Sequence, residues 1–393
     1  AQKKSAAQTV NSRGGVQLTD FEFSASDYDE NRHFFLAHFF RNHYDQWMTQ
    51  LPNILSGVTI NRIELWVTNK TAATTNTRNL VALTDLGEAK KYNDKVWIPN
   101  QNDVAPSNRS NNAYNFILQT APQVRDITQS NAQLDAMDLV GGEDYEKLES
   151  ARLLSSSEYS LNSALGYVSL KSTLQPDQVL AVAFEYTYRG QTYQVGEFST
   201  DVKDNTQALL VKSLKNTANT PKMGNWKLMM RNVYALGATA VQRDRFTLDV
   251  KYLSDTTGVY ISYLPIPRLK DKRLLSLLGL DNLDNNARRV PNGYFDFVEG
   301  YTIDAASGRV FFPEVEPFGS FLANVIGDAD VARNFAYTEL YDSTRTIAKQ
   351  VAEHNKFVIK GRYKATKSDE IVLNTSGIPQ GSVVVTAGGQ ILT

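Results

Sequence analysis

Short runs in which apolar and polar residues alternate predict that much of this chain forms β-strands. A period of two places every second side chain on the same face of a strand, as in VQLTDFEFS over residues 16–24. Arg189-Gly190 separates two such runs and predicts a hairpin with a short turn. The other strands that we expect cover residues 58–69, 78–87, 166–170, 179–188, 191–198, 246–253, 259–264, 357–363 and 371–373.

The last residues predict a strand, a glycine-containing connection and a second strand. The two strands cover residues 382–386 and 390–393, and the second one stops where the sequence stops. A domain seldom ends inside an apolar strand with an unprotected edge. We therefore expect that the native polypeptide continues past Thr393.

Helical spacing of apolar residues is strongest after residue 26. Ser26 or Asp27 can cap this helix, and Pro52 ends it. Its buried face consists of Leu36, Phe40, Tyr44, Trp47 and Leu51. Weaker helical patterns cover residues 122–137, 144–154, 226–236, 331–340 and 344–354, with Gly237 as a C-terminal cap of the third.

The segment EGYTIDAASGRVFFPEVEPFGSF, residues 299–321, predicts a second hairpin. Its apolar positions, Tyr301 and Ile303 before the turn and Val310 and Phe312 after it, flank the sequence Asp304-Ala-Ala-Ser-Gly308. Glycine accepts the positive φ that such a turn needs, so we predict that φ at Gly308 and no ligand at Asp304. Pro313 and Pro317 lack backbone donors, so the chain leaves the sheet there.

These patterns predict an α+β fold that is rich in β-structure, with antiparallel sheets and packed helices in two or more subdomains. A length of 393 residues exceeds one ordinary core. We expect an N-terminal α+β subdomain over 1–204 with a polar insertion near 92–163. A C-terminal β-rich subdomain with helices, truncated at its end, follows over 205–393. The boundary lies in a polar linker, 200–222, which only the apolar run 209–214 interrupts.

Charge and cysteine content narrow the classes of function. The 41 basic and 42 acidic residues leave no basic excess for a nucleic acid partner. The absence of cysteine excludes thiolate nucleophiles, disulfides and Cys-ligated zinc, and suits an exported protein. The longest purely apolar stretch, 179–184, is far too short for a membrane helix.

The sequence contains no convincing catalytic, cofactor or metal site. It lacks a G-x-S-x-G elbow, a P-loop and a G-x-G-x-x-G turn after a strand, so we expect that it is not an enzyme. His33, His38 and His43 are five residues apart, which turns them to different sides of a helix and argues against a metal box. We expect His354, near a helix C-terminus, to complement the helix dipole.

One oxygen-rich stretch contains Asp281, Asp284 and Asp296. Its spacing misses the EF-hand pattern, and Arg288-Arg289 places two positive charges inside it. We favour a solvated Asn/Asp turn, with calcium binding at these three carboxylates as the alternative.

The aromatic residues suggest an alternative function, a binding module. The 19 Tyr and 4 Trp could stack on sugars, but most of them lie on periodic apolar faces where core packing explains them. Exposure of a coplanar aromatic patch would favour a binding module, and convergent carboxylates in a cleft would favour a hydrolase. A scaffold predicts burial of Phe35, Phe40, Trp47, Trp66 and Trp226.

Seven long strings resemble the SprA/Sov family, and they occur in collinear order from about residue 16 to the C-terminus. They are FEFSASDYDENRHFFLAHFFRNHYDQW (21–47), TINRIELWVTN (59–69), TRNLVALTDLGE (77–88), YVSLKSTLQPDQVLAVAFEYTYRGQTYQVGEFSTD (167–201), FDFVEGYTIDAASGRVFFPEVEPFGS (295–320), YDSTRTIAKQVAEHNKF (341–357) and IPQGSVVVTAGGQILT (378–393).

That family comprises giant outer-membrane proteins of the type IX secretion and gliding motility apparatus. The resemblance implies that this chain is an internal soluble fragment of a protein whose main body is a very large transmembrane β-barrel. It implies a non-catalytic scaffold or cap segment of a protein-export channel, with no cofactor. The alternative is a cell-surface binding module for a glycan or a partner protein.

The resemblance also implies partners and a location. The partners are the remainder of the parent barrel, an outer-membrane shuttle protein, a periplasmic plug protein and exported cargo. The location is the outer membrane, with this segment on the cell-surface side or, alternatively, on the periplasmic side.

Overall fold

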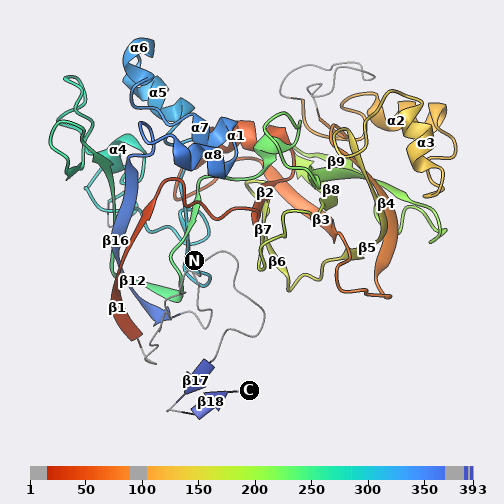
Figure 1. Ribbon diagram of the computed structural model, residues 1–393, viewed down its shortest axis with the longest axis horizontal. Coiled ribbons are helices and arrows are strands. Elements are labelled where there is room, and N and C mark those ends of the chain that lie inside the picture. The colour runs from red at the N-terminus through yellow and green to blue at the C-terminus, as the bar shows by residue number, and fades with distance from the viewer. Residues whose placement is uncertain (1–15, 89–103, 285, 368–384, 388–389, 393) are drawn as a thin grey trace, which may run out of the picture.

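The computed structural model describes residues 16–88, 104–284, 286–367, 385–387 and 390–392. It confirms a β-rich α+β fold in which several antiparallel sheets carry packed helices. The molecule is elongated, with a barrel at one end and a long twisted sheet at the other (Figure 1).

The barrel closes because strand β10 (Leu209–Lys215) pairs on both of its sides. It runs parallel to β4 (Thr77–Leu83) and antiparallel to β8 (Leu180–Tyr188). Strands β3 (Val58–Val67) and β5 (Tyr145–Leu153) complete the ring in the order β10-β4-β5-β3-β8, and β9 (Gln191–Val195) extends it beyond β8.

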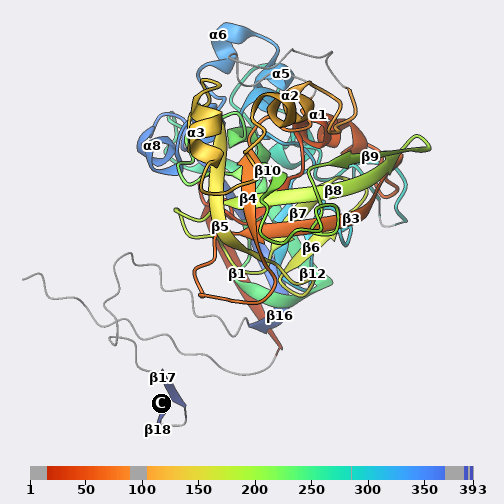
Figure 2. The same ribbon diagram turned by 90° about the vertical axis from the view of Figure 1, so that its right-hand side faces the viewer.

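Alternate residues of the barrel strands fill its interior and cover its outside. On β4, Leu80 and Ala82 pack inside against Trp66, whereas Val81 and Leu83 belong to an outer cluster. Helices α2 (Ala113–Thr120) and α3 (Ser130–Asp135) contribute to that outer cluster. Figure 2 shows both helices beside the barrel strands. These strands are buried on two faces, which explains their nearly continuous apolar sequence.

The second sheet joins strands from opposite ends of the described chain. Strand β16 (Phe357–Lys367) lies between β1 (Val16–Ser24) and β12 (Ala238–Leu253), and β13 (Tyr260–Ile261) pairs with the end of β12. One face packs against the short helices α4 (Leu274–Leu277), α5 (Ser320–Ile326), α6 (Ala329–Ala332), α7 (Glu339–Asp342) and α8 (Arg345–Gln350) and the loops between them.

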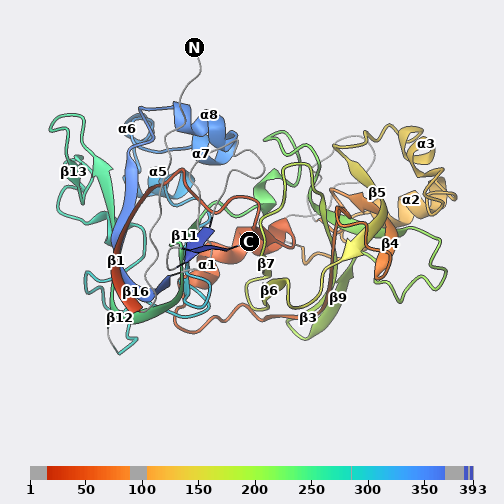
Figure 3. The ribbon, with the colours of Figure 1, turned by 60° about the horizontal axis from the view of Figure 1, so that its bottom comes forward.

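Helix α1 (His38–Met48) lies between the barrel and this second sheet (Figure 3). Its Phe40 ring is 5.4 Å from that of Tyr186 on β8, and its Tyr44 hydroxyl donates to the Phe312 carbonyl at 3.0 Å. One apolar cluster therefore runs through α1 from the barrel wall to the second sheet. This continuous core fixes the two ends of the molecule to each other.

Short strands form three further small sheets. Strands β2 (His33–Phe35), β6 (Tyr159–Asn162) and β7 (Tyr167–Leu170) form one small sheet, and β11 (Val233–Ala235), β14 (Ile303–Asp304) and β15 (Arg309–Phe311) form another. The 3₁₀ helix η1 (Trp226–Leu228) precedes β11, and β17 (Val385–Ala387) pairs with β18 (Gln390–Leu392).

Many predicted strands are confirmed. The structure has β1 where the alternation predicts it, and the hairpin of β8 and β9 turns at Arg189 and Gly190, both with positive φ. Gly308 has the predicted positive φ of 64°, between β14 and β15. A Cβ atom there would collide with the carbonyl oxygen of Ala238, which is a second reason for glycine.

The prediction of a helix from residue 27 to 51 is wrong at its start. Residues 33–35 instead form β2, which pairs with β7. Asp29, near the predicted start of this helix, accepts from His33 and Arg309. These long-range contacts override a local helical pattern that continues only over α1.

Two other helix predictions are wrong. Residues 144–154 form β5, because pairing with β4 on one side and β3 on the other outweighs the helical spacing of its apolar residues. Within 226–236 only η1 is helical, and β11 follows it. Gly237 has a positive φ of 68°, but it connects β11 to β12 instead of capping a helix.

The expected linker contains β10, whose seven residues are all buried in the barrel. Its apolar run is therefore a structural strand and not an interruption in a loop. The division at residue 204 stays a prediction. The strand predicted over 371–373 lies outside the described residues, as do residues 92–103 of the polar insertion.

Candidate functional site

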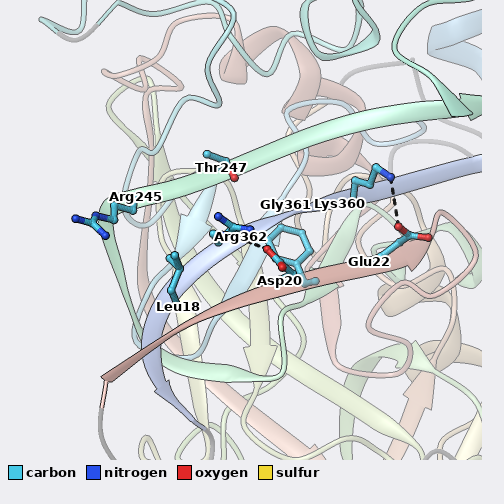
Figure 4. Close-up of a pocket in the computed structure, with 9 residues that line it drawn as sticks. Leu18, Asp20, Glu22, Arg245, Thr247, Lys360, Gly361 and Arg362 are labelled. Carbon is cyan, nitrogen blue, oxygen red and sulfur yellow. Dashed lines mark hydrogen bonds and ion pairs between the residues drawn. The ribbon is translucent and has the colours of Figure 1, made fainter.

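A large surface hollow lies across the exposed face of β1, β16 and β12. It has a volume of about 710 Å³ and is open to solvent. Gly361 lines it, and a Cβ atom at this position would collide with the carbonyl oxygen of Thr247 on β12. Figure 4 shows the residues that line it: Leu18, Asp20, Phe21 and Glu22 of β1, Arg245 and Thr247 of β12, and Lys360, Gly361 and Arg362 of β16.

Most charged side chains in this hollow, which we call the sheet groove, form cross-strand ion pairs. Arg362 Nε donates to Asp20 Oδ1 at 2.6 Å, and Lys360 Nζ lies 3.5 Å from Glu22 Oε2. The hydrogen bond from Arg362 holds the pKa of Asp20 below its usual value. Arg245 extends away from both pairs (Figure 4) and has no carboxylate of the described residues within 4.0 Å.

A second hollow of about 470 Å³ continues the sheet groove and shares Thr247, Lys360 and Gly361 with it. Tyr294, 70% exposed, lines this hollow, and Lys360 Nζ lies 5.6 Å from the ring of Tyr260. The groove thus combines paired charges with exposed aromatic rings. Such a surface can bind a partner by contact, but its lining supplies no serine, cysteine or histidine as a nucleophile or base.

The structure gives each of the three carboxylates its own hydrogen-bond or ion-pair partners, although Asp281 lies near Asp296. Asp284 turns outward and pairs with Arg288 at 2.7 Å. Asp296 accepts the backbone N–H groups of Asn282 and Leu283 at 2.6 and 3.0 Å. Asp281 accepts the Ser276 hydroxyl at 2.7 Å.

Burial, with the charge of Asp281 nearby, raises the pKa of Asp296 to about 7. Backbone N–H donors that point at these carboxylates repel a cation, so the geometry fits a hydrogen-bonded turn. Within the described ranges, no group of three or more His, Cys, Asp or Glu residues is arranged to hold a metal ion.

The histidines bind separate partners. His33 contacts Asp29 at 3.0 Å and Ser169 at 2.7 Å, His38 contacts Glu88 at 3.0 Å, and His43 Nδ1 lies 2.8 Å from the Phe39 carbonyl oxygen. Burial lowers the pKa of both His33 and His38. His354 follows α8 and contacts Glu339 at 2.9 Å.

Acidic residues between the two prolines attach the hairpin 299–321 to α1. Val315 N–H donates to Asp45 of α1 at 2.8 Å, and Arg41 of α1 pairs with Glu316 at 2.5 Å. Burial and the nearby Asp45 carboxylate raise the pKa of Glu314 to about 9. Against the effect of burial, Arg41 and Lys227 hold the pKa of Glu316 below its usual value.

Sequence reasoning missed this junction. Its signal was present, because Glu314 and Glu316 are the only charges in an otherwise apolar run between Val310 and Phe318. Asp304, in the turn itself, accepts from the backbone and the hydroxyl of Ser307.

Among the described residues, no helix is long and apolar enough to cross a membrane. A comparison with curated proteins gives no match.

A comparison with protein families gives a match over the N-terminal part of the chain. Residues 1–194 match the family SprA_N, described as motility related/secretion protein. This matched region covers the barrel strands β3, β4, β5 and β8, helix α1 and strand β1. The chain therefore belongs to the SprA/Sov family of motility and secretion proteins.

Proposed function

We propose that this chain is a non-catalytic scaffold or cap segment of a very large outer-membrane protein-export channel of the type IX secretion and gliding motility system. The observation that carries the proposal is the continuous core through α1, which joins the barrel to the second sheet. A segment that closes or frames a pore must resist deformation, and a shared core gives that resistance.

Burial of the large aromatic residues supports a scaffold. Phe35, Phe40, Trp47, Trp66 and Trp226 are all buried, as a scaffold predicts. Asp45 and Glu314 are hydrogen-bonded carboxylates with raised pKa values, and they lie where the hairpin meets α1 and line neither of the two hollows. We propose that the chain performs no chemistry of its own.

By family membership, the proposed partners are the remainder of the parent barrel, the outer-membrane shuttle, the periplasmic plug and exported cargo. The sheet groove is the surface that we propose for contact with one of these proteins. It is solvent-exposed on a rigid sheet, and it carries Leu18 and Tyr294 as exposed apolar groups.

Deletion of this segment from the detergent-solubilised parent protein tests the capping role. We expect increased pore conductance, reduced secretion or both, because an uncapped channel leaks or fails to guide cargo. A parent protein that carries only Leu55→Ser, a change at an exposed loop residue, is the matched control. Unchanged conductance together with unchanged secretion in the deletion would sink the proposal.

Single cysteines test the proposed cell-surface location, and the natural absence of cysteine makes the background clean. Leu55→Cys and Tyr294→Cys place thiols at exposed positions, whereas Val211→Cys places one inside the barrel. We expect a membrane-impermeant label to reach the first two on intact cells, but not the third. Labelling only after the outer membrane is permeabilised would place the segment on the periplasmic side.

A second candidate function is a binding module for a glycan or a partner at the cell surface. Three exposed tyrosines favour it, namely Tyr260, Tyr263 and Tyr294. Aromatic rings near a shallow groove can stack on sugar rings. Tyr294→Ala should then weaken glycan-array binding by the isolated chain, and Leu55→Ala should not. Absence of binding by the unaltered chain would count against this candidate.

A further inference from the structure

Strand β1 forms an edge of its sheet, because β16 pairs with one side of it and no described strand pairs with the other. Just after β1, Ala25 N–H donates to the carbonyl oxygen of Phe357 on β16 at 3.0 Å. Backbone groups of an antiparallel strand alternate in direction, and the β1–β16 register is regular, so the even residues of β1 point their N–H and C=O groups away from β16. Ser24 agrees with this direction, because its N–H donates outside the sheet, to Asp27 Oδ2 at 3.0 Å.

The backbone groups of Leu18, Asp20 and Glu22 point outward from this edge. Their three N–H and three C=O groups have no hydrogen-bond partner among the described residues. The three side chains are exposed on the groove face of β1 (Figure 4). A row of unpaired backbone groups at an exposed edge is a template for a further strand.

The groove face of β1 is acidic. Asp20 pairs with Arg362 of β16, and Glu22 pairs with Lys360 of the same strand. Neighbouring strands thus carry opposite charges on this face, which is the favourable arrangement for residues opposite each other in a sheet. A strand beyond β1 continues the arrangement if it carries basic residues on the groove face.

The other face of β1 is aromatic. Phe21 and Phe23 are stacked with their ring centroids 5.5 Å apart, and both are partly buried against the core. Phe21 also stacks on Tyr363 of β16 at 6.0 Å. A strand beyond β1 extends this aromatic face if its residues there are apolar. The edge therefore fits a strand in which basic and apolar residues alternate.

The charge of β1 argues against a second copy of β1 as the occupant. Antiparallel pairing of two β1 strands centred on Asp20 places this carboxylate opposite the Asp20 of the other copy. A register shifted by two residues toward Glu22 places Asp20 opposite Glu22. Like charges directly opposite each other destabilise a strand pair.

We propose that the free edge of β1 binds an extended segment of a partner protein, in which basic residues alternate with apolar ones and which joins the sheet as a further antiparallel strand. The backbone groups of Leu18, Asp20 and Glu22 form its hydrogen bonds. Its basic side chains lie opposite Asp20 and Glu22, and its apolar side chains extend the aromatic face. This inference rests on the proposed contact between the sheet groove and a partner protein, and it names the chemistry of that partner.

Binding of two synthetic peptides to the whole chain tests the edge. In one peptide of about eight residues lysine alternates with valine, and in the other glutamate replaces lysine. We expect the lysine peptide to bind and to slow amide hydrogen exchange at Leu18, Asp20 and Glu22 by about tenfold, because their N–H groups become hydrogen-bonded. The N–H groups of the odd residues of β1 already bond to β16, so their exchange is the internal control.

A charge reversal is the second test. Asp20→Lys combined with Glu22→Lys should weaken binding of the lysine peptide by about tenfold and should allow the glutamate peptide to bind instead. Asp177→Lys, at an exposed acidic residue of the loop before β8, is the matched control and should leave both affinities unchanged. Unchanged affinity of the lysine peptide for the reversed variant would overturn the proposal.

A third measurement uses only the unaltered chain. In antiparallel pairing, the peptide residues opposite Leu18, Asp20 and Glu22 turn both backbone groups toward β1, and these residues are the lysines. N-methylation of the lysine backbone nitrogens should therefore abolish binding, whereas N-methylation at the valines should keep it. Equal binding of the two methylated peptides, equal binding of the lysine and glutamate peptides, or no binding of the lysine peptide would overturn the proposal. None of these results would overturn the capping role, because deletion of the segment from the parent protein tests that role separately.

Discussion

The barrel and the β1–β16–β12 sheet differ in how deeply their ion pairs are buried. In the barrel, Lys212 is fully buried, and its Nζ lies 2.6 Å from Glu88, which is buried too. In the sheet, Arg362 and Asp20 form an equally short pair of 2.6 Å, but both side chains are at least half exposed. The two ion pairs have the same length, but only the pair in the barrel is shielded from solvent.

This contrast distinguishes a part that holds the molecule together from a part that is free to contact others. A buried pair depends on both members, because removal of one leaves an unpaired charge in an apolar medium. An exposed pair exchanges its partner for water at little cost. A partner protein can therefore rearrange the charges of the sheet groove, but it cannot rearrange those of the barrel.

The largest effect is expected from Trp66→Ala inside the barrel. Trp66 is 1% exposed and packs among Leu80, Ala82 and Ala181. Its removal leaves a large cavity and should lower the free energy of unfolding by about 3–5 kcal/mol. Denaturant titration measures this loss. Tyr294→Ala beside the sheet groove is the control, and a similar loss there would contradict the contrast between the regions.

Lys212→Met should have the next largest effect. The change leaves Glu88 buried without Lys212, its main counter-charge. Burial alone would raise the pKa of Glu88, and the charge of Lys212 helps to hold that pKa at about 2. We expect a loss of about 3 kcal/mol, the lower end for a broken buried pair, because His38 remains 3.0 Å from Glu88. Denaturant titration of Lys212→Met and Arg362→Met compares the two regions directly. Equal losses would mean that burial does not decide the strength of these pairs.

Glu314 and Glu88 should give opposite pH dependences. The pKa of Glu314 is raised from 4.5 to about 9 in the folded state, so folding retains a proton that the unfolded chain releases. Its contribution is present below about pH 4.5 and is lost as pH rises toward 9. The lowered pKa of Glu88 gives the reverse, a contribution lost as pH falls from 4.5 toward 2.

Glu314→Gln tests the first of these dependences. In the unaltered chain, we expect the part of the unfolding free energy that comes from Glu314 to fall by about 2 kcal/mol between pH 5 and 7. The variant keeps a neutral hydrogen-bonding side chain, so its stability should depend less on pH over that interval. An unchanged pH profile would mean that Glu314 is ionised in the folded protein.

Sequence patterns identified the strands whose neighbours are close in the chain. The hairpin of β8 and β9 and the turn at Gly308 follow from local residue preferences, and both are confirmed. The patterns failed where partners are distant. Residues 144–154 have helical spacing, but they form β5 because two strands flank them. No local signal contains that information.

The same limit applies to the sheet groove. Its floor pairs residue 21 with residue 361, and only the folded register brings Asp20 to Arg362. The junction at Glu314 and Glu316 could have been predicted in part, because charged residues inside an apolar run indicate buried partners. Their partners on α1 could not be named, because a helical pattern does not specify which distant loop packs against it.

The smallest effect is expected from Asp20→Asn in the sheet groove. The change removes an ion pair with Arg362 but keeps the shape of the side chain, and solvent already surrounds both groups. Tm should therefore stay within about 1 °C of that of the unaltered chain. If the groove contacts a partner, as we propose, the same variant should alter secretion or partner binding in the full-length parent while Tm stays constant. A stability loss as large as that of Lys212→Met would mean that the pair supports the fold, and the sheet would then belong with the barrel as structural framework.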